Sequence, residues 1–130
     1  QWEYGARGGT TTPWWTGLER ESLRERGAAN LADQAAARAG APWQEIRDWP
    51  ELDDGYPVHA PAGSLEPNAF GLHEVVGNGY EWCLDGYDET FYERSPDVDP
   101  VAQWLGIGTR VLRSGGECQT NCVSGLGAMV

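Results

Sequence analysis

The stretch PNAFGLHEVVGNGYEWCLDGY, residues 67–87, decides the fold. Its opening Pro-Asn pair and its glycines predict a turn-rich loop, because glycine adopts backbone angles that other residues avoid. From Tyr80 to Asp85, apolar and polar residues alternate with the period of a half-buried strand. We therefore expect a glycine-rich turn that leads directly into a strand anchored by Trp82.

Oxygen atoms gather in the sequence around this turn. Two carboxylates flank it, and glycine carbonyls lie between them: Glu74, Gly77, Gly79 and Glu81, here called the central site. Carbonyl and carboxylate oxygens are the ligands that a hard cation such as calcium prefers. Two interpretations stay open for the residues themselves. The carboxylates are solvated surface groups, or they hold calcium.

FGLHEVVGNGYEWCLDGY, residues 70–87, resembles the signature of the formylglycine-generating, sulfatase-modifying family. Further matches follow the same order: QWEYGARGG at 1–9, AANLAD at 28–33 with DGYPVHAPAGS at 54–64, and RVLR at 110–113. The resemblance implies an α+β, C-type-lectin-like fold with little regular secondary structure and bound calcium. It implies calcium at the central site. It also implies a second calcium site, here called the Asn30 site, made by the Asn30 side chain, the Leu31 carbonyl, Asp54 and the Tyr56 carbonyl.

The resemblance also divides the chain. Residues 1–113 are expected to form the central part of a sulfatase-modifying-factor-like domain, and residues 114–130 a divergent tail. Because the family domain has portions before and after this region, we expect the sequence to be a fragment of a larger domain.

The tail decides between two functions. Oxidase members of the family bind copper(I) through two cysteines separated by four residues, since soft thiolates suit a soft metal. Here Cys118 and Cys122 are the candidate catalytic pair, and three residues separate them. We therefore expect a calcium-stabilised binding or scaffold domain without oxidase activity. The alternative is a copper-dependent formylglycine-generating oxidase that acts on a sulfatase cysteine, and only this alternative requires copper.

The composition of the chain limits the classes of binding partner that it can have. The 130 residues carry 20 acidic and 9 basic side chains, a formal charge of -11 that repels a phosphate backbone and argues against nucleic acid. No apolar run reaches the length of a membrane span. We expect a protein or peptide ligand in the groove of the fold. His59 and His73 are expected to be structural or surface residues, and the cellular compartment stays open.

Local patterns predict several short elements. A helix is expected to end at Gly8 and Gly9, and another to cover residues 19–26. Asn30 is the expected N-cap of a short helix that ends at Gly40. Residues 110–113 read as a strand. The other expectations concern buried side chains, namely Trp43 and Trp49 as core anchors and Cys83 as a small buried hydrophobe.

Overall fold

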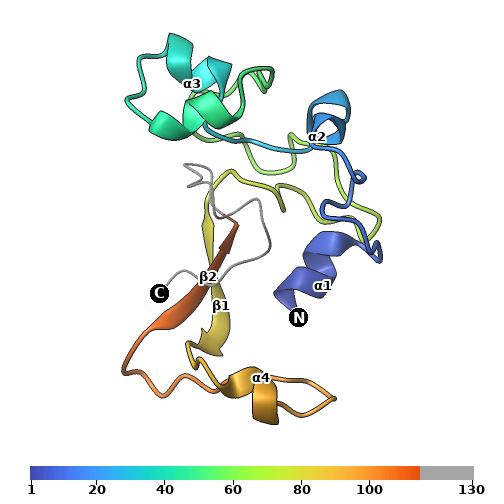
Figure 1. The fold of residues 1–130 in the computed structure, drawn as a ribbon, viewed down its shortest axis with the longest axis vertical. Coiled ribbons are helices and arrows are strands. Elements are labelled where there is room, and N and C mark those ends of the chain that lie inside the picture. Colours follow the sequence, from blue (N-terminus) through green and yellow to red (C-terminus); the bar gives the residue numbers. More distant parts are fainter. Residues whose placement is uncertain (115–130) are drawn as a thin grey trace.

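A computed structural model describes residues 1–114. It contains short elements joined by long loops, as expected: α1 (Trp2–Arg7), α2 (Glu21–Glu25), α3 (Gln34–Arg38), the 3-10 helix η1 (Gln44–Asp48), β1 (Tyr80–Gly86), α4 (Phe91–Arg94) and β2 (Arg110–Ser114). Figure 1 shows α2 and α3 at the top, the two strands in the middle with α1 to their right, and α4 at the bottom. None of the helices within residues 1–114 is long and apolar enough to cross a membrane.

The first helix ends as its sequence predicts. Gly8 caps α1 at φ 57°, a left-handed conformation that glycine adopts without a side-chain clash. The loop that begins residues 67–87 is joined to this helix by Asn68. Its side-chain Nδ2 donates to the carbonyls of Gly5 and Ala6. The Asn68 oxygen accepts from the amides of Phe70 and Leu72. One buried side chain thus joins two segments that are distant in the sequence.

The N-cap of α3 was wrongly predicted. Asp33, not Asn30, caps the helix, and its carboxylate accepts from the amides of Ala35 and Ala36. The physical reason is that the Asn30 side chain is already engaged with Val58 and Asn78. Asp33 is fully buried, and its second oxygen accepts from the Asp54 amide at 2.6 Å. Asp33 therefore fixes both the helix start and the loop that carries Asp54.

The core lies in the half of the chain before β1. Its buried cluster consists of Leu23, Ala28, Ala29, Leu31, Trp49 and Leu52, with Trp14, Trp15 and Val76 packed against it. Trp49 is a core anchor, as expected, whereas Trp43 is only partly buried. Because Leu31 belongs to the cluster, the backbone at Asn30 and Leu31 is held against the buried core.

The sheet corrects the prediction for Trp82. β1 and β2 pair antiparallel from Tyr80 opposite Ser114 to Gly86 opposite Arg110, with an irregularity between Trp82 and Gly86. Cys83 is 9% exposed, which confirms its burial, but Trp82 is 65% exposed and does not anchor the strand in the core. The alternation correctly indicated two different faces. Alternation does not indicate which of the two faces the rest of the chain covers. In this structure the covered face is the one that carries Cys83.

Candidate functional site

The Asn30 site is built where two loops meet the core. The Asp54 carboxylate accepts from the Leu31 amide at 3.0 Å and from the Tyr56 amide at 2.8 Å. These bonds place Asp54 directly beside the backbone that follows Asn30. The structure thus brings together the segments that carry all four residues of the predicted Asn30 site.

Two oxygen-bearing groups of this site are removed from water. Asn30 is 1% exposed, and its side-chain oxygen Oδ1 is buried without a hydrogen-bond partner. Burial raises the pKa of the Asp54 carboxyl to about 6, and the two amide bonds offset this only in part. A buried acceptor oxygen and a desolvated carboxylate, carried by adjoining segments, are the kinds of group that a hard cation would satisfy. The donor set of the Asn30 site therefore fits calcium.

The side chain of Asn78 completes the surroundings of Asn30. Its Oδ1 accepts from the Asn30 Nδ2 at 2.9 Å and from the Ala60 amide at 2.7 Å. Its Nδ2 donates to the Ala60 carbonyl at 3.2 Å. The GNG sequence signal indicated a turn here, but it did not indicate that the Asn78 amide would join two other loops.

The central site is arranged differently. The two oxygens of Glu74 accept from the amides of Leu65 and Gly63 at 3.0 and 2.9 Å. Glu81 accepts from the indole nitrogen of Trp2 on α1 at 2.5 Å. These hydrogen bonds direct the two carboxylates to different segments of the chain.

The glycine carbonyls of the central site are also partly engaged. The Gly77 carbonyl accepts from the Ser114 hydroxyl at 2.7 Å and from the Gly79 amide at 2.8 Å. The second of these bonds closes a tight turn around Asn78, which has φ 66°. Calcium at the central site would therefore compete with protein donors for three of its four ligand residues.

Within residues 1–114, the structure shows no cluster of three or more His, Cys, Asp or Glu side chains that could hold a metal ion. His59 and His73 are both exposed, as expected for surface residues. The ring nitrogen Nδ1 of His73 lies 2.8 Å from the Leu65 carbonyl oxygen. Cys118 and Cys122 lie outside the described residues.

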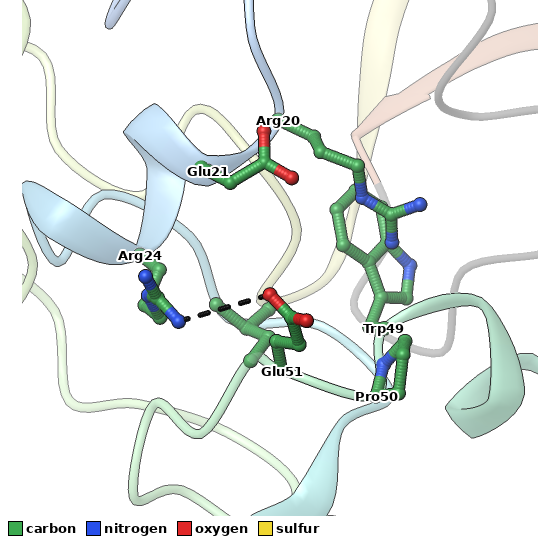
Figure 2. Close-up of a pocket in the computed structure, with 7 residues that line it drawn as sticks. Arg20, Glu21, Arg24, Trp49, Pro50 and Glu51 are labelled. Atoms are coloured by element: carbon green, nitrogen blue, oxygen red, sulfur yellow. Dashed lines mark ion pairs between the residues drawn. The ribbon is translucent and has the colours of Figure 1, made fainter.

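A separate cavity of about 180 Å³ lies between α2 and the loop after η1 (Figure 2). The guanidinium of Arg20 stacks over the Trp49 ring at 4.3 Å, and Arg24 pairs with Glu51 at 4.0 Å. Three of the four charged side chains of this cavity, those of Arg20, Arg24 and Glu51, therefore already contact other residues of the chain. A second cavity, of about 270 Å³, lies between α1 and the start of β1, with Trp2, His73 and Glu81 in its wall.

Comparison with known proteins decides the family. The family described as "Sulfatase-modifying factor enzyme 1-like domain" matches residues 1–126. The chain belongs to the sulfatase-modifying factor family.

Several members of this family resemble the chain in sequence. It is 34% identical over 116 residues to a formylglycine-generating enzyme of Streptomyces coelicolor, covering 88% of this chain and 33% of that protein. A formylglycine-generating enzyme of Thermomonospora curvata is 33% identical over 124 residues, covering 88% of this chain and 35% of the relative. The chain thus spans about a third of the length of these curated relatives.

A solved structure supports the fold. The structure of Treponema denticola variable protein 1 superposes with a TM-score of 0.57 at 21% identity, covering 94% of this chain and 36% of that one. At this identity the likeness concerns the fold alone. It agrees with the sulfatase-modifying factor assignment and with the small number of regular elements in residues 1–114.

Proposed function

We propose that the chain is a calcium-stabilised binding or scaffold segment of the sulfatase-modifying factor family, with a C-type-lectin-like fold and no oxidase activity of its own. The observation that carries the proposal is the buried Asn30 Oδ1, which has no hydrogen-bond partner. A buried polar atom without a partner costs roughly 1–3 kcal/mol, so native structures rarely leave one unsatisfied.

Calcium at the Asn30 site would satisfy that oxygen and neutralise Asp54. The ligands would be the side-chain oxygens of Asn30 and Asp54 with the carbonyls of Leu31 and Tyr56. When bound, the ion supplies positive charge and oxygen coordination and takes no part in redox chemistry. Because the described part of the chain has short elements, cross-linking two loops at the core would stabilise the whole fold.

The central site is proposed as a second, weaker calcium site. Glu74 and Glu81 are acidic and close in sequence, which favours it. Each, however, would have to release or share a hydrogen bond with Gly63, Leu65 or Trp2. We therefore expect calcium to occupy the Asn30 site first.

The experiment that tests calcium stabilisation is thermal unfolding of the 130-residue chain in calcium chloride and in a chelator. At a calcium concentration a hundred times its dissociation constant, binding should add about 2.7 kcal/mol to the free energy of unfolding. Magnesium chloride is the control, because its smaller ion needs a stricter octahedral geometry. An unfolding midpoint that is the same in calcium and in chelator contradicts the proposal.

The second candidate function is a copper-dependent formylglycine-generating oxidase that acts on a sulfatase cysteine. The relatives named formylglycine-generating enzymes favour it. The spacing of Cys118 and Cys122 opposes it, because three residues separate them where the oxidases of the family have four. Catalysis needs reacting groups held in one geometry, and an error near 1 Å can cost about a hundredfold in rate.

Oxygen consumption separates the two functions. The chain is loaded with copper(I) and given a cysteine peptide of the CxPxR pattern. We expect no oxygen uptake above that of a Cys118→Ser, Cys122→Ser control. Copper-dependent uptake with an aldehyde product in the peptide, absent from this control, would establish the oxidase. A protein or peptide ligand of the groove stays a proposal under either function.

A further inference from the structure

The side-chain amide of Asn78 has only one possible orientation. Its two ends face the backbone of Ala60, with Oδ1 2.7 Å from the amide nitrogen and Nδ2 3.2 Å from the carbonyl oxygen. A backbone N–H only donates and a carbonyl only accepts. Ala60 therefore determines which end of the Asn78 amide is oxygen.

This orientation determines the next amide. The Nδ2 of Asn30 donates to the Asn78 Oδ1 at 2.9 Å and to the Val58 carbonyl at 3.1 Å. Both of these partners are acceptors. If the Asn30 amide flipped, its oxygen would face two acceptors and its NH₂ group would lose both, which costs about 1–3 kcal/mol for each unsatisfied group.

The backbone around the two residues is fixed as well. The Asn30 amide donates to the Val76 carbonyl at 3.2 Å, and the Asn78 amide donates to the Asn30 carbonyl at 2.8 Å. Gly77, which precedes Asn78, also pairs with Asn30 in a parallel β-bridge. Since neither residue can turn as a whole, the side-chain hydrogen bonds alone set where the Asn30 Oδ1 points.

We infer that Asn78 is a positioning residue for calcium, which holds the Asn30 amide with its oxygen toward the ion of the Asn30 site. The inference rests on the proposed function and extends it to a residue that does not itself bind the ion. On this inference, the turn Gly77-Asn78-Gly79 supports the Asn30 site. The turn then acts as an orienting support, in the way that hydrogen-bonded neighbours orient metal ligands elsewhere.

The test is calorimetric titration of calcium chloride into the full 130-residue chain and its Asn78→Gly variant. Glycine accepts the φ of 66° at this position, so the change removes the side chain without backbone strain. We expect calcium binding to weaken by about 10–100-fold, the usual effect of losing a residue that orients a metal ligand. Trimethylamine N-oxide, present in every titration, keeps destabilised variants folded.

A second background distinguishes positioning from simple structural support. In Asn30→Asp, an oxygen occupies both side-chain positions, so the orientation of the group no longer matters. Asn78→Gly should then not weaken calcium binding, because in this background it removes an acceptor that faces the new carboxylate.

Three results would overturn the inference. One is equal calcium affinity of the wild type and Asn78→Gly, which leaves the calcium proposal intact. Another is the same loss of affinity in the Asn30 and Asn30→Asp backgrounds, which assigns Asn78 a structural role only. The last is an absence of calcium binding by the wild type, which overturns the proposed function itself.

Discussion

The Asn30 site and the central site both combine acidic side chains with turn carbonyls, but they differ in how the protein treats the oxygens. At the Asn30 site, one oxygen is buried without a partner and one carboxylate has a raised pKa. At the central site, both carboxylates accept hydrogen bonds from the chain. The difference teaches that a sequence motif rich in oxygen ligands does not by itself identify where the fold leaves an oxygen without a protein donor.

The largest expected effect concerns the contact between the two sites. A Cβ at Gly77 would lie 1.8 Å from the Asn30 carbonyl oxygen. The backbone of Gly77 also has φ 82°, which disfavours residues with a side chain. Gly77→Ala should therefore destabilise the chain by more than about 4 kcal/mol, because the clash involves backbone on both sides. Urea unfolding measures this loss.

Gly79→Ala is the matched control for that change. A Cβ at Gly79 has no heavy atom within 4 Å. We expect a change of less than about 1 kcal/mol. Similar losses for the two variants would contradict the close approach of the central turn to Asn30.

The next effect separates the two sites by their response to calcium. Asp54→Asn removes the charged ligand of the Asn30 site, so the calcium-dependent gain of about 2.7 kcal/mol at saturating ion should disappear. Asp53→Asn is the control, because Asp53 is exposed and pairs with Arg38 instead. Thermal melting with and without calcium checks both variants. An unchanged response in Asp54→Asn would exclude the Asn30 site.

The pH dependence of calcium binding has a smaller expected effect. The pKa of Asp54 is raised from 3.8 to about 6 by burial, so without calcium the folded chain binds more protons than the unfolded chain between these values. The contribution of Asp54 to stability therefore falls as the pH rises through this window.

Without calcium, the folded chain favours the protonated form of Asp54. Calcium favours the opposite form, because it binds the deprotonated carboxylate. Below pH 6, calcium affinity should fall about tenfold per pH unit, or roughly 1.4 kcal/mol. Titrations of calcium at several pH values measure this slope. An affinity that is constant from pH 7 to pH 5 would place the ion away from Asp54.

The smallest expected effect lies at the central site. Glu81→Gln keeps an oxygen that can accept from Trp2, so calcium-free stability should change by less than about 1 kcal/mol. If calcium fills the Asn30 site first, most of the calcium-induced rise in midpoint should remain in this variant. Loss of the whole rise would make the central site the principal one.

The sequence predicted the parts of the fold that depend on local chemistry. The glycine cap of α1 follows from its turn residues and the strand at Tyr80–Gly86 from alternation, and the strand expected at residues 110–113 is present as Arg110–Ser114. The family resemblance was confirmed. The exposed face of β1 and the cap of α3 were wrong, because each depends on which distant segment arrives beside it.

The same limit applies to the candidate site. Asp54 and Asn30 could be proposed from the resemblance, but the hydrogen bonds of Asn78 and Asp33 could not. Both are side-chain bonds between loops that are about 20 to 50 residues apart, and no periodicity in the sequence encodes them. The boundary at residue 113 and the pair Cys118 and Cys122 stay predictions.

A crystal structure of the 130-residue chain grown in calcium chloride tests calcium at the Asn30 site most directly. We expect an ion with six to eight oxygen ligands at about 2.3–2.6 Å, including the Asn30 Oδ1, the Asp54 carboxylate and the carbonyls of Leu31 and Tyr56. A water molecule at that position, hydrogen-bonded to the Asn30 Oδ1 in crystals with calcium present, would contradict it.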